Sequence, residues 1–301
     1  MSSAPSTAVL AAVERLRKRL WAHCYRMTGR RADADDLCQE AIARAIERAD
    51  DLAATTRADA WIFRIATTVC LDHLRRSRRV ERVTELVDPV VLDDTAAPDD
   101  PQATVIRRDD VRFAVVVALQ RLAPKQRAAL LLHDVCGLEL ADVATTLGTN
   151  ANAAKAALHR ARAALARARG RIDVDAPVDA AVVERLARAL ESRSVDALRA
   201  VLADDVWGVV DGGGVVRVAT KPSFGARALV RRFANLSRRV PVPVACRVVR
   251  VNGEPCVLVT VPSAGDAAFA SVHVETRDGR IVAMRVVRDP VKLVPLQAHL
   301  Q

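Results

Sequence analysis

The chain has 301 residues, enough for two or three domains of ordinary size. Aromatic residues make up only 3% of it, so the cores must be built from Leu, Val, Ile and Ala. A net charge of +10 favours an anionic partner, nucleic acid first, and the lack of any apolar run near the ~18 residues of a membrane span excludes an integral membrane protein.

Six cysteines are scattered along the chain, with no CxxC pair and no metal-like spacing. We therefore expect reduced thiols in a cytoplasmic protein, with no metal site, and no sequence pattern indicates a cofactor. The charges near the N-terminus follow a short apolar stretch, whereas a secretory signal carries them in front of it. Neither export nor membrane association is expected.

Residues 7–79 show the apolar spacing of three helices. The first helix is expected at about Thr7–Met27, with Gly29 ending it, and Asp33 can cap the second. The third spans about Ala58–Arg79 and ends in a dense arginine cluster. Since this cluster exceeds what a helix dipole needs, it favours contact with phosphates.

The segment Leu138–Arg169 has the pattern of a helix-turn-helix, whose second helix enters the DNA major groove. Gly148 ends its first helix, and Thr149 is a natural N-cap for the second. The second helix is basic and contains no acidic residue. A solvated face normally mixes both signs, so this one favours DNA over the alternative of an Ala-rich helical hairpin.

Three motifs in this order resemble regions 2 and 4 of an extracytoplasmic-function sigma factor of the sigma-70 family: DADDLCQEAIARAI, DAWIFRIATTVCLDHLRRSRR and LAPKQRAALLLHDVCGLELADVATTLGTNANAAKAALHRARAAL. The resemblance implies an all-α region 2 domain in residues 1–82 and a region 4 helix-turn-helix domain in residues 109–171. It also implies that the second helix binds the clamp helices of the RNA polymerase β′ subunit, because its charged but non-basic face suits a protein partner. The residues for this contact are Asp35, Asp36, Gln39, Glu40 and Arg44.

The resemblance further implies two contacts with promoter DNA. The residues for recognising and melting the −10 element are Arg57, Trp61, Arg64, Thr68, His73, Arg75 and Arg76. The residues for reading the −35 element are Asn150, Asn152, Ala153, Lys155, Arg160 and Arg162. Trp61 has a core position as its alternative, and Thr68 replaces the Asn that the family often carries. The family usually has larger residues at Ala156 and Ala157, so modest intrinsic −35 affinity is expected.

Residues 83–108 are rich in proline and aspartate, which argues against a packed element. The resemblance implies an acidic linker that threads toward the RNA exit path of the polymerase, and a plain solvated tether is the alternative. A second, short linker covers residues 172–178.

Residues 179–301 alternate between helix and strand patterns, which predicts an α+β domain. The expected helices are Ala180–Ser192, Val195–Ala203 and Ser223–Arg239. The expected strands are a hairpin of Val206–Val210 and Val215–Ala219, then Val244–Val251, Pro255–Val261, Ala268–Thr276 and Arg280–Val287. Turns are expected at Asn252-Gly253 and Asp278-Gly279. This part resembles the SnoaL-like (NTF2-like) conical barrel that is fused to some sigma factors of this type.

Such fused factors often carry a DGGGK motif, an NPDKL-like motif and a WLPEP-type motif in the linker. This chain has partial matches to the first two in Asp211, Gly212, Gly213, Gly214 and in Asp289, Pro290, Lys292, Leu293. The linker segment ELVDPV, Glu85–Val90, lacks the Trp. The resemblance implies that the C-terminal domain regulates the protein through contact with the linker or region 2.

SnoaL-like domains include enzymes, so catalysis has to be weighed. The acid–base candidates are Asp211, Asp266 and His273. A lone His on a strand is more often structural, and neither paired carboxylates nor a Ser/His/Asp group stands out. We therefore expect no catalytic residue.

The sequence predicts a cytoplasmic alternative sigma factor that binds core RNA polymerase, directs −10 and −35 recognition, and is regulated by its own C-terminal domain. One alternative is a helix-turn-helix regulator that works without polymerase. Another is a C-terminal domain with ligand-binding or isomerase/cyclase-like activity. The sequence leaves open whether an anti-sigma factor or a small ligand is a further partner.

Overall fold

The computed structural model describes residues 4–49, 58–76, 87–89, 112–169, 177–219, 221–239, 242–265 and 267–297. These residues fall into two compact units. The first contains the helices up to residue 169, apart from 112–114, and the second contains 87–89, 112–114 and 177–297. The boundaries expected at residues 82, 108 and 171 lie outside the described residues and stay predictions.

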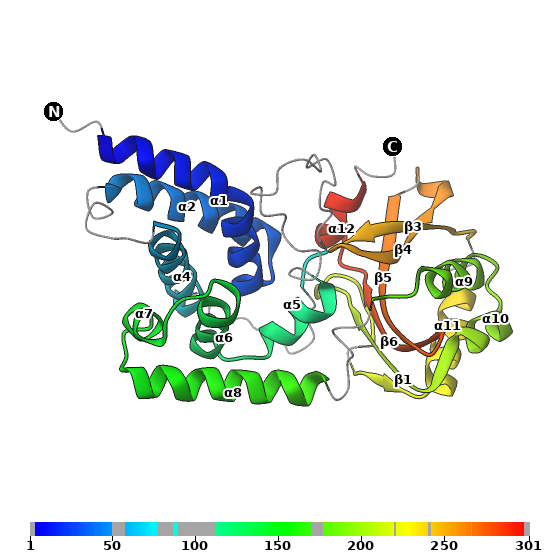
Figure 1. Ribbon diagram of the computed structural model, residues 1–301. Helices are drawn as coiled ribbons and strands as arrows, with labels where there is room; N and C mark the ends of the chain where they lie inside the picture. Colours follow the sequence, from blue (N-terminus) through cyan, green and yellow to red (C-terminus); the bar gives the residue numbers. More distant parts are fainter. Residues whose placement is uncertain are drawn as a thin grey trace. The chain divides into compact units, whose positions relative to one another are not determined.

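The first unit begins with three packed helices, α1 (Ala4–Thr28), α2 (Arg31–Glu47) and α4 (Ala58–Arg76) (Figure 1). Their contact is lined by buried Leu, Ile and Ala side chains, as the apolar spacing predicts. Gly29 ends α1 with a left-handed φ of 72°. The prediction that Asp33 caps α2 is wrong: the helix begins two residues earlier.

The same unit continues with α5 (Phe113–Gln120), whose first two residues belong to the second unit. Then follow α6 (Pro124–Leu130), a π-helical turn η2 (Leu131–Val135), α7 (Leu140–Thr146) and α8 (Ala151–Arg169). The helix-turn-helix is thus α7 and α8, which pack against each other. Gly148 takes a φ of 59° after α7, as expected for a helix end. Asn150, and not Thr149, caps α8, because its Oδ1 accepts a hydrogen bond from the Ala153 N–H at 2.8 Å.

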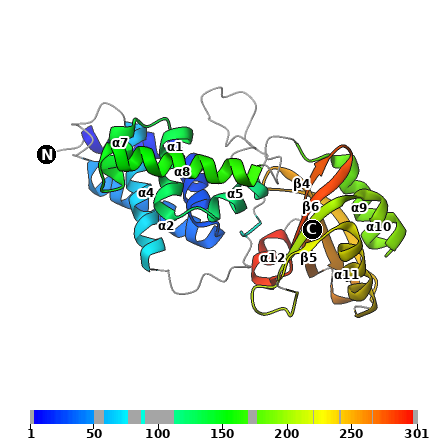
Figure 2. The same cartoon turned by 90° about the horizontal axis from the view of Figure 1, so that it is seen from below.

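The second unit is a six-stranded sheet with helices on both faces (Figures 1 and 2). Its strands, in the spatial order β2-β1-β6-β5-β4-β3, are β1 (Leu202–Asp211), β2 (Ser223–Phe224), β3 (Ala245–Val251), β4 (Glu254–Val261), β5 (Ala267–Arg277) and β6 (Arg280–Val287). Helices α9 (Ala180–Glu191), α10 (Val195–Val201) and α11 (Ala226–Arg239) share one apolar core with the sheet. Helix α12 (Pro290–Gln297) contacts β5 from the other face. The predicted α+β architecture is confirmed.

Two details of this sheet differ from the prediction. Residues 215–219 form no strand, because the chain turns away at Gly213 and Gly214, whose φ angles are 61° and 75°. β1 pairs instead with the short β2 and, in parallel, with β6, so the sheet is mixed. The two predicted hairpin turns are confirmed, since Asn252-Gly253 and Asp278-Gly279 all take left-handed φ angles.

Within the described part of the chain, no helix combines the length and the apolar character that crossing a membrane requires.

Candidate functional site

The residues predicted to bind polymerase lie along the outer side of α2. Leu37, Cys38 and Ala41 point into the helical core, which leaves Asp35, Asp36 and Gln39 exposed. The half-buried Glu40 and Arg44 form an ion pair of 2.5 Å one turn apart. Asp35 also accepts a hydrogen bond from the Trp21 indole at 2.6 Å. The result is an exposed ridge of carboxylate and amide groups held on a rigid helix.

The residues predicted for the −10 element lie on α4, except Arg57, which lies outside the described residues. Trp61 is half-buried, so it is neither a full core residue nor a free surface residue. Thr68 is exposed, but its hydroxyl donates to the Arg64 carbonyl at 2.9 Å. Arg75 and Arg76 are exposed at the end of the helix, where cations also suit the dipole.

Besides Arg75, which pairs with Asp72 of the same helix at 3.1 Å, two members of the −10 set have acidic partners on other helices. The His73 ring lies 3.2 Å from Asp33, the residue predicted as a cap. Arg64 forms an ion pair of 3.8 Å with Asp142 of α7. The second pair brings the helix predicted to read −10 DNA against the first helix of the helix-turn-helix.

The residues predicted for the −35 element lie on and before α8. Asn152, Ala153 and Lys155 are exposed in its first turns, and Arg160 is exposed further along. The side-chain amide oxygen of Asn150, Oδ1, caps the helix. Figure 1 shows α8 as one straight helix along the edge of the first unit.

Two findings on α8 correct the sequence interpretation. Ala157 is 7% exposed, so its small size serves packing and does not remove a DNA contact. Arg162 is paired with Asp134, with its Nε 3.0 Å and its Nη2 2.5 Å from the two carboxylate oxygens. Part of the positive charge on this helix is therefore neutralised within the domain.

Arg127 of α6 ties the two helical regions of the first unit together. The residue is 2% exposed, and its guanidinium donates to four carbonyl oxygens. Three belong to the α5 end, at Leu119, Gln120 and Leu122, and the fourth is that of Met27 in α1. These four hydrogen bonds satisfy donors of a buried cation, and they make the contact between the regions specific.

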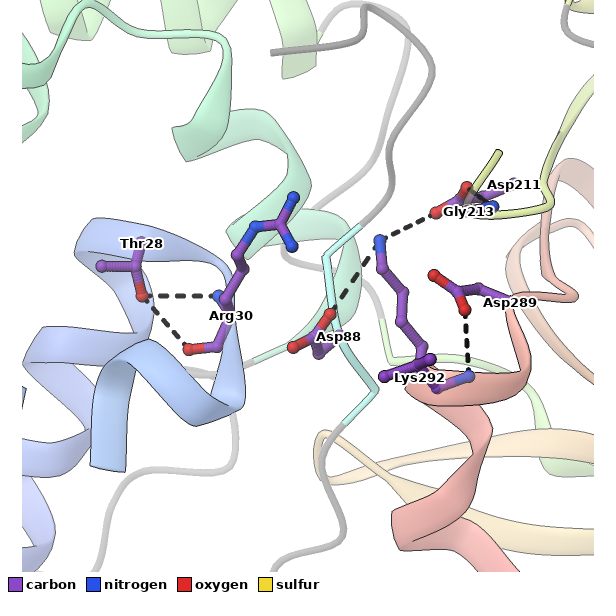
Figure 3. Close-up of polar contacts among 8 residues, drawn as sticks. Thr28, Arg30, Asp88, Asp211, Gly213, Asp289 and Lys292 are labelled. Carbon is purple, nitrogen blue, oxygen red and sulfur yellow. Dashed lines mark hydrogen bonds and ion pairs between the residues drawn. The ribbon is translucent and has the colours of Figure 1, made fainter. Parts of the chain in front are cut away.

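A buried lysine joins the linker to the C-terminal domain (Figure 3). The Lys292 ammonium lies 2.9 Å from Asp211 Oδ2 and 3.9 Å from Asp88 Oδ1. The exposed fraction of the side chain is 6% for Lys292, 3% for Asp211 and 18% for Asp88, so the three charged groups are largely shielded from solvent. We call Asp88, Asp211 and Lys292 the linker latch.

Gly213 of the DGGG motif allows the turn after Asp211 to approach Asp289 closely. Gly213 has a φ of 61°, and a Cβ there would meet Asp289 Oδ2 at 2.1 Å. Asp211 Oδ1 accepts from the Gly213 N–H at 2.8 Å, while Asp289 Oδ1 accepts from the Val291 N–H at 2.9 Å (Figure 3). The two partial motifs therefore meet, and glycine is required where they touch.

A second contact holds the chain just after the linker. Arg112 pairs with Glu254 at 2.7 Å, and its side chain is 5% exposed. The Phe113 ring stacks on His273 with 3.9 Å between centroids and 5° between planes. Burial raises the pKa of Glu254, and the nearby Arg112 opposes that rise. Sequence reasoning missed these residues, since 142 positions separate Arg112 from Glu254.

The three acid–base candidates do not come together. Asp211 belongs to the latch, and Asp266 lies outside the described residues. His273 is buried beside Ser271, at 3.1 Å, and burial together with the charge of Arg285 lowers its pKa to about 3. Neither Asp211 nor His273 lines the cavity of about 500 Å³ in this domain, whose described lining contains no Asp, Glu or His.

Comparison with known proteins supports the prediction of two sigma-factor regions in the helical part of the chain. The family described as Sigma-70 region 2 matches residues 12–80, and Sigma-70, region 4 matches residues 112–165. The chain is 34% identical over 291 residues to ECF RNA polymerase sigma factor SigJ of Mycobacterium tuberculosis, which covers 93% of this chain and 91% of SigJ. ECF RNA polymerase sigma factor SigG of the same species is 37% identical over 224 residues, covering 65% of this chain and 60% of SigG.

A solved structure extends the likeness to the whole fold. The crystal structure of M. tuberculosis extracytoplasmic function sigma factor SigJ matches with a TM-score of 0.73 and 30% identity. The match covers 95% of this chain and 98% of the SigJ chain, so it includes the C-terminal α+β domain.

Proposed function

Because this chain belongs to the extracytoplasmic-function sigma factors, which bind core RNA polymerase and direct it to promoters, we propose that its C-terminal domain regulates this activity by holding the linker. The observation that carries the proposal is the linker latch, in which Lys292 contacts both Asp88 of the linker and Asp211 of the domain. A stand-alone helix-turn-helix regulator would have no use for the region 2 helices at residues 12–80.

The latch is well suited to a contact that must be specific. Lys292 is buried, and a buried ammonium is costly unless carboxylates compensate it. Asp211 supplies one carboxylate from the same domain, and Asp88 supplies the other from the linker. Release of Asp88 leaves Lys292 paired with Asp211, so the linker can leave without unfolding the domain.

The contact after the linker gives the domain a second hold. Arg112 and Phe113 lie on the sheet through Glu254 and His273, directly before the rest of α5. The linker is therefore held at residues on both sides of 90–111. A domain that holds both sides limits how far the two DNA-reading regions can separate.

We further propose that the ridge of Asp35, Asp36, Gln39, Glu40 and Arg44 binds the β′ clamp helices. The exposed residues of α4 and α8 would contact the −10 and −35 elements, and the protein would act in the cytoplasm, where core polymerase works. Most of the residues on α2 and α8 are exposed, which supports the assignment, and Arg162 would contact DNA only after leaving Asp134. The C-terminal domain is proposed to have no catalytic role.

Run-off transcription with core polymerase tests the regulation. The samples are the full chain, a chain truncated after Arg171, and Asp88→Asn, which removes the linker charge from Lys292. We expect truncation and Asp88→Asn to change the transcript yield in the same direction, by several-fold, because both release the linker.

The matched control is Asp278→Asn in an exposed turn of the same domain, which should leave the yield unchanged. If truncation changes the yield and Asp88→Asn does not, the latch is not the route of regulation. If neither changes it, the domain does not regulate transcription at all.

A further inference from the structure

The C-terminal domain encloses a cavity of about 500 Å³ on the face of the sheet that α10 and α11 cover. Its walls are mostly apolar, with Leu202, Leu229, Phe233, Val259 and Phe269 among the lining residues. This volume lies within the range of small-molecule sites, and an apolar wall favours a ligand with an apolar body.

The charged side chains of the cavity all have one sign. Six arginines line it, namely Arg193, Arg217, Arg231, Arg232, Arg239 and Arg288, and the described lining contains no Asp or Glu. Arg217, Arg231 and Arg239 are exposed and so belong to its mouth, whereas Arg193, Arg232 and Arg288 are half-buried. The Arg193 guanidinium donates to two carbonyl oxygens, those of Ser237 and Val242. Exposed arginines are solvated without a ligand, so Arg232 and Arg288 carry the argument.

Arg288 is a cation that lacks an anionic partner among the described residues. Its Nε is buried and has no hydrogen-bond partner. Its guanidinium lies 3.9 Å from the centre of the Phe269 ring, which lines the cavity. Burial lowers the pKa of Arg288, so its charged form is partly desolvated. A partly desolvated guanidinium without an anion is costly, and a carboxylate would satisfy it with short, charge-assisted hydrogen bonds.

Arg232 repeats the pattern on α11. Burial lowers its pKa as well, and its guanidinium donates to the Lys221 carbonyl at 3.2 Å. A neutral carbonyl satisfies one donor but does not balance the charge. The inner part of the cavity therefore combines an apolar surface with uncompensated positive charge.

We propose that this cavity binds an apolar organic acid, with the carboxylate on Arg288 beside Phe269 and the apolar body against the sheet and α11. Arg232 and the arginines of the mouth supply the positive field that selects an anion. The described lining contains no Asp, Glu, His, Lys, Tyr or Cys, so the site is built for binding and not for acid–base chemistry. The proposal does not depend on the linker latch.

Calorimetric titration of the full-length chain with decanoate, below its micelle concentration, tests the site. Decanol keeps the apolar body without the charge, acetate keeps the charge without the body, and 2-naphthoate replaces the chain by a ring system. We expect decanoate or 2-naphthoate to bind at a one-to-one ratio, at least tenfold more tightly than decanol, and acetate not to bind measurably. Whichever of the two acids binds more tightly shows whether chain-like or ring-like acids fit.

The double variant Arg232→Gln/Arg288→Gln should weaken binding of the acid at least tenfold and leave the affinity for decanol unchanged. Arg227→Gln on α11, an exposed arginine outside the cavity, is the matched control and should bind as the wild type does. If the double variant does not fold by circular dichroism, Arg232→Gln alone is used and should weaken binding several-fold. Equal affinity for the acid and for decanol, no binding of either acid, or unchanged acid binding in the folded arginine variant would overturn the proposal.

Discussion

At the scale of residues, the second unit carries an unusual amount of buried charge on the sheet face opposite α9–α11. Arg285 and Glu275 form an ion pair at 1% and 4% exposure, and the Arg285 guanidinium lies 4.9 Å from the Trp207 ring centre. Removing one partner of such a pair commonly costs about 3–5 kcal/mol, because it leaves the other charge buried alone. His273 is the neutral member of this face, because burial and then the charge of Arg285 lower its pKa.

Acidification should destabilise the folded protein through His273. Its pKa is lowered from 6.5 to about 3 by burial and by the charge of Arg285, so the unfolded chain binds a proton between these values and the folded chain does not. Stability from this group is therefore full above pH 6.5 and falls as the pH drops toward 3, by about 2 kcal/mol between pH 7 and pH 5. Urea unfolding at the two pH values measures it.

The control isolates His273 from the other titrating groups. Glu254, whose pKa is raised by burial, acts in the opposite direction, and His23 of the first unit, whose pKa is lowered to about 3, acts in the same one. His273→Asn keeps those groups, so the loss between pH 7 and pH 5 should shrink by about 2 kcal/mol in the variant. An equal loss in wild type and variant would contradict the assignment.

At the scale of elements, α2 packs into the core with one face and exposes the residues of the proposed polymerase contact on the other. One side buries Leu37, Cys38 and Ala41 against α1 and α4, and the other exposes the ridge proposed to bind polymerase. Because the exposed residues carry little of the packing, their charges can be reversed without unfolding the helix.

Asp36→Arg should weaken binding to core polymerase by about tenfold or more, which is about 1.4 kcal/mol. The reason is that it places a cation where the proposed contact with the polymerase uses a carboxylate. Its unfolding midpoint should stay close to that of wild type. Fluorescence anisotropy of the labelled protein with core polymerase measures the affinity. Glu14→Arg on α1, also an exposed reversal, is the control and should bind normally. Similar losses in both variants would show a general charge effect and not a site on α2.

At the scale of the molecule, the helical regions of the first unit are packed in a closed arrangement. Arg64 of α4 is paired with Asp142 of α7, and Arg127 bonds the Met27 carbonyl. The −10 and −35 elements lie roughly 25 base pairs apart, about 85 Å along the duplex at 3.4 Å per base pair. Helices that contact each other cannot span this distance, so the closed arrangement has to open when both elements are bound.

A covalent bridge between the regions should therefore block initiation. We expect the double variant Arg64→Cys/Asp142→Cys, joined by a short cleavable bis-maleimide, to lose run-off transcription and to regain it when the bridge is cleaved. Wild type and both single variants, treated alike, control for reaction of the native cysteines. Full transcription from the bridged protein would show that the two regions need not separate.

The sequence by itself determined the helices, the order of the regions and the family. Apolar spacing and glycine punctuation are local signals, and they predicted α7, α8 and the two hairpin turns correctly. Local signals also gave two wrong predictions. Asp is a residue type that often caps helices, but the Asp33 side chain lies against His73. Residues 215–219 have the alternating pattern of a strand, but they form none. The site residues named from the resemblance mostly lie on exposed faces, and their roles stay predictions.

Only the tertiary structure decided which distant residues meet. The pairing of Asp88 with Lys292, of Arg112 with Glu254 and of Arg64 with Asp142 joins positions far apart in the chain, and no periodicity records such pairs. The cavity is likewise formed by segments from residue 190 to residue 288, and each of its arginines looks like ordinary surface charge in the sequence. The physical reason is that burial changes what a charge costs, and burial is a property of the folded chain.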